Sequence, residues 1–218
     1  MPQRTTLAKL TPPRLYAVTR RVRLFTLLEE HHRRHPLIWV AGPPGAGKTS
    51  LVANYLAEYK SRTLWYHVDP GDVDLATFFH YLAQAAQAAA PRKKLRLPAL
   101  TPEFMADVPG FTRRFMRELW SKVPLPAVLV LDNYQELPIE ALLHRMIPIA
   151  LAEFPQGAAL IVISREGVPE AFARELVHNG VGHIRWEDLR LTLEETASLA
   201  GSVSGIDEET LRSLHAKA

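Results

Sequence analysis

Residues 42–49 read Gly-Pro-Pro-Gly-Ala-Gly-Lys-Thr, a complete G-x-x-x-x-G-K-[ST] motif, and this segment constrains the fold more than any other. An apolar run at 36–41 precedes it and a helix-forming stretch at 51–59 follows it, which is the strand–loop–helix setting that the motif needs. Glycines let backbone N–H groups approach phosphate oxygens, and the start of the following helix favours the same anion. The alternative is a glycine-rich turn that matches by chance. The setting favours a nucleoside triphosphate site.

Each position of the motif has an expected contact. Lys48 is expected to reach the β- and γ-phosphates, and the Thr49 hydroxyl to hold Mg²⁺. The expected cofactors are therefore ATP or ADP together with Mg²⁺. The residues expected to bind the nucleotide are Gly42, Pro44, Gly45, Ala46, Gly47, Lys48, Thr49 and Ser50.

Composition excludes several other classes of protein. The chain has 218 residues, of which 47% are hydrophobic and 22% charged, which is ordinary for a globular protein. It has no cysteine, so neither a disulfide nor a cysteine-ligated zinc site is available. No apolar run approaches the 18 residues of a membrane span, and the start of the chain lacks a signal-peptide core. A cytoplasmic location without membrane contact is expected.

Charge is distributed unevenly along the chain. Residues 1–35 carry eight Lys or Arg and two Glu, whereas residues 36–218 carry eighteen Lys or Arg and twenty-one Asp or Glu. Such a basic arm could contact nucleic acid, supply arginines to a nucleotide, or form a solvated surface. Because no reader motif or interleaved aromatic residue accompanies the charge, direct DNA binding by this arm is not favoured.

Apolar patterning predicts strands that alternate with helices. Such alternation is typical of a parallel α/β sheet covered on both faces. The predicted strands are 37–41, 63–68, 127–131, 158–164 and 181–186. The predicted helices are 22–34, 51–59, 75–89, 111–122, 139–154, 169–178, 193–200 and 208–216, and Pro148 is expected to kink the fifth of these.

Asp132 is the second strong signal, because it ends an uninterrupted apolar run in the Walker B manner. At the carboxyl end of a central strand its carboxylate can hold Mg²⁺. The alternative is an aspartate that only ends a strand. Asn133 follows where hydrolytic P-loop enzymes commonly carry a second carboxylate, and an amide cannot accept a proton from water. Glu136 is the nearest substitute, or it simply begins the next helix. Slow hydrolysis or binding alone is therefore expected.

Two further groups of residues are site candidates. Arg165 follows the predicted strand 158–164, where it could contact a γ-phosphate or lie on the surface of a loop. His31, His32 and His35 form a basic cluster whose spacing does not suit a metal site, so a solvated helix end is expected.

Seven segments in fixed order resemble one family over nearly the whole chain. They are 10–15, 21–24, 42–49, 65–69, 130–136, 164–165 and 189–195. This set resembles the nucleotide-binding region of the large ATP-dependent, LuxR-type bacterial transcription activators related to the maltotriose-responsive regulator. Those proteins belong to the signal-transduction ATPases with numerous domains (STAND), and the resemblance implies a five-stranded P-loop NTPase sheet with a small helical C-terminal extension.

The resemblance also implies roles for particular residues. It places the strand that ends at Ser164 between the two Walker strands, which brings Arg165 beside the γ-phosphate. In such proteins the N-terminal arm packs near the nucleotide base, and Val18, Arg20 or Arg21 would be the matching contacts. Many relatives carry an acidic residue at the position of Asn133, so the resemblance supports binding more firmly than hydrolysis.

The expected organisation is a basic arm and helix at 1–35, a nucleotide-binding domain at 36–190 and the start of a helical lid at 191–218. Relatives continue into further domains, so an excised or truncated piece of a longer regulator is expected. The expected function is an ATP/ADP switch that regulates transcription, with Lys48, Asp132, Glu136 and Arg165 as its catalytic residues, and that self-associates or contacts other domains. The alternative is a genuine P-loop enzyme, either a kinase or an AAA-like ATPase.

Overall fold

The computed structural model describes residues 7–14, 20–59, 61–92 and 94–200. Its centre is a parallel sheet of five strands in the order β2-β3-β4-β1-β5. The strands are β1 (Leu37–Ala41), β2 (Arg62–His67), β3 (Ala127–Asp132), β4 (Ala158–Ser164) and β5 (Val181–Ile184). The five-stranded parallel α/β sheet expected from the sequence is thus confirmed, and β4 lies between β1 and β3 as the resemblance implied.

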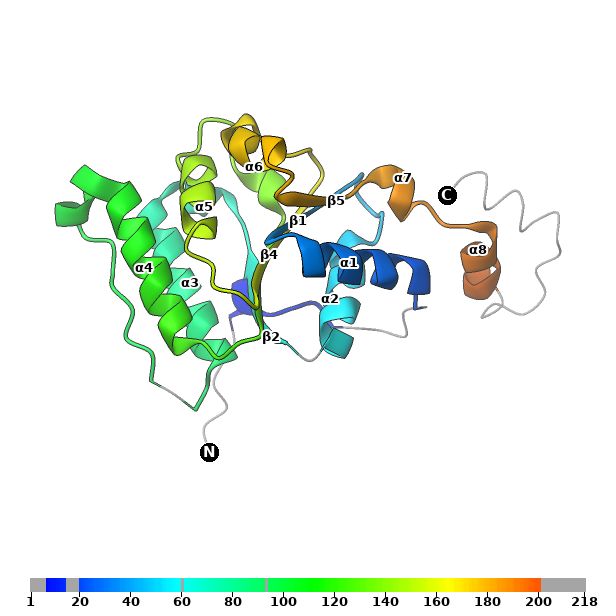
Figure 1. Ribbon diagram of the computed structural model, residues 1–218, viewed down its shortest axis with the longest axis horizontal. Coiled ribbons are helices and arrows are strands. Elements are labelled where there is room, and N and C mark those ends of the chain that lie inside the picture. Colours follow the sequence, from blue (N-terminus) through cyan, green and yellow to red (C-terminus); the bar gives the residue numbers. More distant parts are fainter. Residues whose placement is uncertain (1–6, 15–19, 60, 93, 201–218) are drawn as a thin grey trace.

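Helices cover both faces of this sheet (Figure 1). The α-helices are α1 (Val22–Arg34), α2 (Lys48–Tyr59), α3 (Leu75–Ala89), α4 (Val108–Lys122), α5 (Leu143–Leu151), α6 (Ala173–Val177), α7 (Trp186–Leu189) and α8 (Leu193–Ala200). Short 3-10 turns lie at η1 (Ala8–Leu10), η2 (Pro70–Val73), η3 (Pro102–Asp107), η4 (Tyr134–Glu136) and η5 (Glu170–Phe172). α3, α4 and α5 lie on one side of the sheet, and α1 and α2 on the other.

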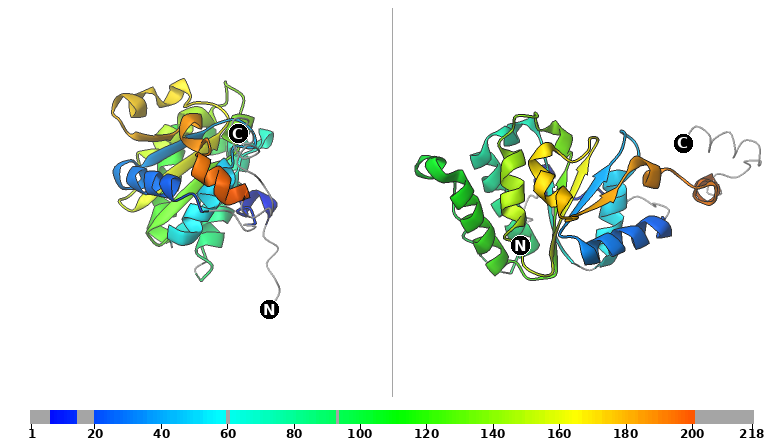
Figure 2. Two further views of the ribbon diagram at one scale, coloured as in Figure 1. Left: turned by 90° about the vertical axis from the view of Figure 1, so that its right-hand side faces the viewer. Right: turned by 45° about the horizontal axis from the view of Figure 1, so that its top comes forward.

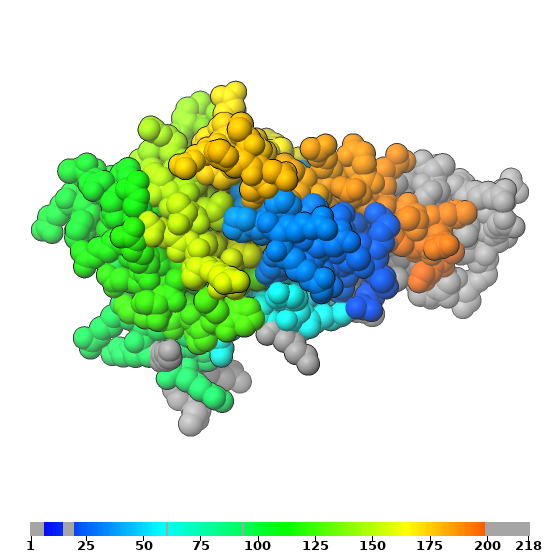
Figure 3. Space-filling view, viewed as in Figure 1, coloured from blue at the N-terminus to red at the C-terminus, as the bar shows by residue number. Residues whose placement is uncertain are grey.

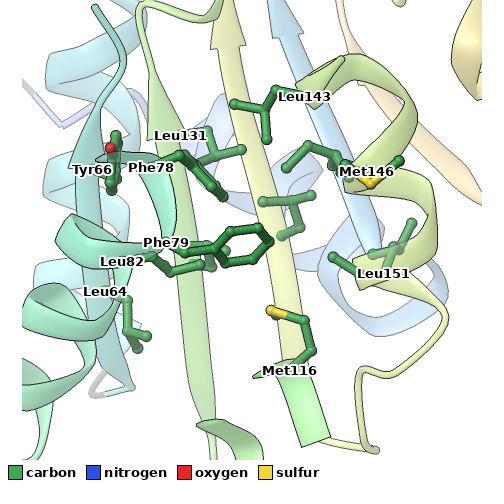
Figure 4. Packing of buried hydrophobic residues seen from close by; sticks show 14 of the residues in the cluster. Leu64, Tyr66, Phe78, Phe79, Leu82, Met116, Leu131, Leu143, Met146 and Leu151 are labelled. Carbon is green, nitrogen blue, oxygen red and sulfur yellow. The ribbon is translucent and has the colours of Figure 1, made fainter. Parts of the chain in front are cut away.

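The two faces bury separate hydrophobic clusters, because alternate residues of a strand point to opposite sides. Leu129 and Leu131 of β3 join the cluster under α3, α4 and α5, whereas Val128 and Val130 join the cluster under α1 and α2. Figure 4 shows the first cluster, where Phe78 and Phe79 of α3 meet Met146 of α5 above the strands. A sheet covered on both faces needs continuous apolar strands, and this accounts for the runs at 127–131 and 158–164.

Some predicted boundaries differ from the structure. The predicted helix 139–154 is wrong at its start, because Pro138 opens a turn in which Ala141 N–H donates to its carbonyl, and α5 begins only at Leu143. Pro148 lies inside α5. The predicted strand 181–186 ends at Ile184, since Arg185 N–H donates to the Asp188 carboxylate and caps α7. The predicted helix 208–216 lies outside the described residues.

Candidate functional site

The phosphate-loop motif lies between the end of β1 and the start of α2, at the carboxyl edge of the sheet, where parallel α/β folds bind their ligands. Gly45 and Gly47 have φ values of +79° and +76°. This left-handed region is strained for residues with a Cβ, so glycine is required at both positions. Gly42 is close-packed, since an added Cβ would lie 3.0 Å from Leu189 Cδ1 of α7.

Lys48 is the buried cation of the loop. Its Nζ donates hydrogen bonds to the carbonyls of Gly42 at 2.7 Å and Pro43 at 2.8 Å. Burial and the nearby charge of Arg165 lower the pKa of Lys48, against the opposing attraction of Asp132. An ammonium carries three donors, so Nζ keeps one donor for an anionic oxygen while holding the loop closed.

Asp132, at the end of β3, faces the first residues of α2. Thr49 Oγ1 donates to Asp132 Oδ1 at 3.1 Å, and Asn133 N–H donates to the same oxygen at 3.0 Å. On the other side, His67 Nδ1 lies 3.2 Å from Asp132 Oδ2, and this contact with the carboxylate raises the pKa of His67 despite burial. The Walker residues of the sequence motif are therefore brought together.

The residues around Asp132 fit a magnesium ion. Mg²⁺ takes oxygen ligands, and the Thr49 hydroxyl and the Asp132 carboxylate supply them within hydrogen-bonding distance of each other. Asp132 is 1% exposed, and His67 Nδ1, 3.2 Å away, is the described group that pairs with its Oδ2. A buried carboxylate charge is costly unless it is paired, and a bound cation would offset that cost.

Two cavities adjoin the loop and share Pro44, Gly45, Gly47 and Ser50 in their walls. The first, which we call the phosphate pocket, has a volume of about 360 Å³ and contains Lys48, Thr49, Asn133, Gln135 and Arg165. The second, which we call the apolar pocket, has a volume of about 530 Å³. Its walls are Arg21, Phe25, Pro44, Gly45, Ala46, Gly47, Ser50, Leu51, Asn54, Trp186, Leu189, Leu191 and Glu195.

Arg21 joins the beginning of α1 to the chain around α8. Its Nη2 donates to the carbonyls of Leu189 at 2.8 Å and Arg190 at 2.9 Å and to Glu195 Oε2 at 2.9 Å. We call these contacts the arginine clasp. Figure 3 shows the dark blue start of α1 against the orange segment that contains α8, and Figure 2 gives the same arrangement from two further sides. The clasp forms part of the wall of the apolar pocket.

Of the other predicted site residues, only some lie at the two pockets. Arg165 follows β4 and lines the phosphate pocket, where its backbone N–H donates to Gln135 Oε1 at 3.0 Å. Glu136 is exposed on η4, its Oε1 accepts from the Gln135 amide at 3.2 Å, and it does not line the phosphate pocket. Arg20 is exposed, pairs with Glu58 at 3.0 Å and lines neither pocket, and Val18 lies outside the described residues.

Sequence reasoning missed residues that the fold brings in from a distance. Trp186 and Glu195 reach the apolar pocket from α7 and α8, far along the chain from the motif. Gln135 was not assigned a role, although it lines the phosphate pocket. Asp188, which caps α7, is the sequence signal that could have placed Trp186 on a helix rather than on a strand.

Comparison with known families agrees with this geometry. The AAA domain family matches residues 31–174, which is more than half of the chain. The chain belongs to the AAA domain family. It is therefore a P-loop ATPase-like nucleotide-binding domain, in which β1 to β4, the phosphate loop and the Walker aspartate all fall inside the matched segment. No curated protein is similar enough to the sequence to be counted as a match.

Among solved structures, a Walker-type ATPase of Pyrococcus abyssi shares the fold of this AAA domain, with a TM-score of 0.56 and 15% identity. The match covers 90% of this chain and 62% of that protein, so the chain spans less than two thirds of its length. AMPPCP-bound DnaA from Aquifex aeolicus matches at 15% identity over 90% of this chain and 55% of DnaA, with a TM-score of 0.46. The replication initiator DnaA bound to AMPPCP and single-stranded DNA matches at 15% identity, over 89% and 56% of the two chains, with a TM-score of 0.42.

Among the described residues, no helix has both the length and the apolar character that crossing a membrane requires.

Proposed function

We propose that this AAA domain is an ATP/ADP-binding switch, with Mg²⁺, in a cytoplasmic signal-transduction ATPase that regulates transcription. The observation that carries the proposal is the pair of adjoining cavities, one polar and one apolar, that share the walls of the phosphate loop. A nucleotide has the same division into a polyanionic and an aromatic part. The phosphate pocket would hold the phosphates and the apolar pocket the nucleoside.

The apolar pocket suits a nucleoside in size and chemistry. A volume of about 530 Å³ falls in the range of small-molecule sites. Phe25 and Trp186 offer aromatic surface for a base, while Arg21 and Asn54 supply polar groups. Arg21 is thus the residue of the basic arm that we propose as a nucleotide contact, and Arg20 is the weaker candidate because it pairs with Glu58 on the surface.

At the phosphate pocket, Thr49 and Asp132 would hold the metal ion, and Lys48 and Arg165 would contact the phosphates. Bound Mg²⁺ neutralises phosphate charge and orients the phosphate oxygens. Arg165 directly follows the strand between the two Walker strands and lines the phosphate pocket, which supports a role in distinguishing a nucleotide that has a γ-phosphate from one that lacks it.

Slow hydrolysis is supported by the chemistry of the pocket lining. Among the described residues that line the phosphate pocket, there is no carboxylate that could take a proton from water. The pocket is lined instead by the amides of Asn133 and Gln135, and Glu136 is exposed outside the pocket. An amide can orient a water molecule but cannot act as a general base. These features favour a switch over a rapid enzyme, whether a kinase or an AAA-like ATPase.

The regulatory part of the proposal is supported by the ordered segments shared with LuxR-type STAND regulators. We propose the arm and first helix at 1–35, the nucleotide-binding domain at 36–190 and the beginning of a helical lid at 191–218. Mg²⁺–ATP would favour an open, self-associating state and ADP a closed one, because a ligand shifts the population toward the state that it binds more tightly. Other domains of a longer regulator are the proposed partners, rather than DNA or a membrane.

Calorimetry with ATP and ADP tests the binding part. Replacing Lys48 by alanine removes charge-assisted hydrogen bonds to phosphate, so we expect affinity to fall by roughly tenfold or more. Lys94→Ala, which removes an exposed lysine outside both pockets, is the matched control. Unchanged affinity in Lys48→Ala would refute nucleotide binding at this loop. A steady-state ATPase rate well above one turnover per minute would instead favour the enzyme alternative.

A further inference from the structure

Glu195 presents a hydrogen-bond acceptor at the wall of the apolar pocket that has no donor in the described part of the chain. All contacts of its side chain go to one oxygen, Oε2: Arg21 Nη2 lies at 2.9 Å, Arg23 Nη2 at 3.4 Å and the Thr192 N–H nitrogen at 3.0 Å. No described residue donates to the other oxygen, Oε1. The two oxygens of this carboxylate therefore have different surroundings.

The arginine clasp holds the carboxylate in one orientation. Arg21 ties Oε2 to the start of α1, while the Glu195 N–H donates to Thr192 Oγ1 at 3.1 Å, so side chain and backbone are both fixed at the beginning of α8. The side chain is 13% exposed, and Oε1 remains accessible, unlike the buried Nε of Arg21. Because Glu195 lines the apolar pocket, Oε1 is available to a molecule in that pocket.

The charge of Glu195 makes Oε1 an acceptor only. Burial raises the pKa of Glu195, but hydrogen bonds from Arg21 and the Thr192 N–H outweigh it, so the pKa lies below its usual value. Near neutral pH the group is therefore an ionised carboxylate, which accepts hydrogen bonds and donates none. Hydrogen bonds to such a charged oxygen are stronger than those between neutral groups.

Asn54 adds a second acceptor to the same pocket. Its Nδ2 donates to the Ser50 carbonyl at 2.8 Å, and only the amide nitrogen can donate, so the amide oxygen has no donor among the described residues. A pocket with unpaired acceptors favours a ligand that brings O–H or N–H groups, since other ligands would remove water from these acceptors without replacing its hydrogen bonds.

We propose that Glu195 Oε1 accepts a hydrogen bond from an O–H or N–H group of the bound nucleoside and so selects ligands that carry this donor. The donor is a ribose hydroxyl or the exocyclic amine of the base, which share this chemistry. In dinucleotide-binding α/β folds an acidic residue accepts from a ribose hydroxyl in the same way. The inference rests on the proposed function, since it assumes that a nucleoside occupies the apolar pocket.

The substitution Glu195→Gln separates the two oxygens. The N–H groups that meet Oε2 require an oxygen, so the glutamine oxygen takes that place and the amide nitrogen replaces Oε1 at the pocket. The variant thus keeps the hydrogen bonds of the clasp and exchanges an acceptor for a donor at the pocket. Glu194→Gln is the matched control, because it removes the same charge one position earlier in α8, where the side chain is exposed and lines neither pocket.

Calorimetry in EDTA compares ADP with analogues that each lack one donor. They are 2′-deoxy-ADP, 3′-deoxy-ADP and purine riboside 5′-diphosphate, which lacks the exocyclic amine. We expect the wild type and Glu194→Gln to bind one analogue roughly tenfold more weakly than ADP, because a hydrogen bond to a charged group is lost. That analogue identifies the donor. In Glu195→Gln the affinity for ADP should fall to about that of the same analogue.

Two results would overturn the proposal. The first is equal affinity of the wild type for ADP and all the analogues, a measurement that does not depend on the folding of any variant. The second is a preference for ADP that persists unchanged in Glu195→Gln, which would assign the donor to another acceptor of the pocket, such as Asn54. Urea denaturation of Glu195→Gln shows whether the variant remains folded.

The outcomes also separate this inference from the proposed function. If the wild type binds ADP, Lys48→Ala weakens that binding and the analogues bind as ADP does, only the role of Glu195 is wrong. If the wild type binds neither ADP nor ATP, the proposed function is refuted and this inference falls with it.

Discussion

The arginine clasp offers a direct test of what holds the wall of the apolar pocket in place. The perturbation is Arg21→Ala. The side chains of Arg21 and Glu195 are only 14% and 13% exposed, so their ion pair is screened far less than a surface pair. Arg21 also connects the start of α1 to two backbone carbonyls that precede α8.

The expected loss of stability follows from the geometry of the clasp. All three contacts come from one nitrogen, Nη2, which carries two hydrogens, so they amount to two full hydrogen bonds at most. Hydrogen bonds that involve a charged group contribute roughly 1.5–3 kcal/mol each. Two features reduce the sum. Arg21 Nε is buried without a partner among the described residues, and Glu195 keeps Arg23 at 3.4 Å after the substitution. We therefore expect a loss of about 2 kcal/mol.

Urea denaturation, followed by circular dichroism, measures this loss as a shift of the midpoint at constant slope. The neighbouring residue supplies a matched control. Arg20 also forms an ion pair, with Glu58 at 3.0 Å, but the two side chains are 58% and 50% exposed. Exposed pairs contribute no more than about 1 kcal/mol, so Arg20→Ala should change the midpoint little.

Equal losses in Arg21→Ala and Arg20→Ala would refute the reasoning, because burial would then not distinguish the two ion pairs. A loss in Arg21→Ala that disappears when Glu195→Gln is already present would assign the effect to the ion pair. A loss that persists there would assign it to the carbonyls of Leu189 and Arg190.

Two further predictions concern charge. Burial raises the pKa of Glu195, but hydrogen bonds from Arg21 and Thr192 N–H and the charge of Arg21 outweigh it, so the pKa lies below the usual 4.5. The ion pair of the clasp should therefore contribute fully above the unfolded-state pKa of Glu195 and be lost as pH falls through its lowered pKa in the folded protein, whereas the bonds to the carbonyls of Leu189 and Arg190 remain. The difference in unfolding free energy between wild type and Arg21→Ala, measured by urea titration, should therefore be smaller in acid than at pH 7, without vanishing. Separately, Arg165→Ala should weaken ATP by roughly tenfold and ADP much less, measured by calorimetry, and equal losses for both nucleotides would contradict a γ-phosphate contact.

Strands were the most predictable part of the fold. β4 and the apolar part of β3 are continuous apolar runs, and burial on both faces of a parallel sheet leaves no other residue types available there. The placement of β4 between β1 and β3 did not follow from those runs. The resemblance implied this placement. Strand order depends on which distant segments pair, and the apolar pattern of one strand does not show which strand lies beside it.

Segments without a continuous buried face were predicted less accurately than the strands. Ile139 looks like part of a helix in the sequence, yet it is 87% exposed and lies in the turn that Pro138 opens, so its apolar character does not mark a buried helix face. In the candidate site, the Walker residues were found because each ends a recognisable local pattern. The sequence did not identify Trp186, Glu195 or His67 as site residues, because each contacts residues that are distant along the chain.

Strand order also decides which residues lie on either side of Asp132. β3, which ends in Asp132, has β2 on one side and β4 on the other. The end of β2 carries His67, which contacts Asp132, whereas β4 leads into Arg165. The Asp132 carboxylate, which we propose as a ligand of Mg²⁺, is thus flanked by His67 on one side and, on the other, by the strand that leads to Arg165, the proposed γ-phosphate contact. For the proposed switch, substitutions at the ends of either flanking strand should therefore change nucleotide affinity more than substitutions at the opposite edge of the sheet.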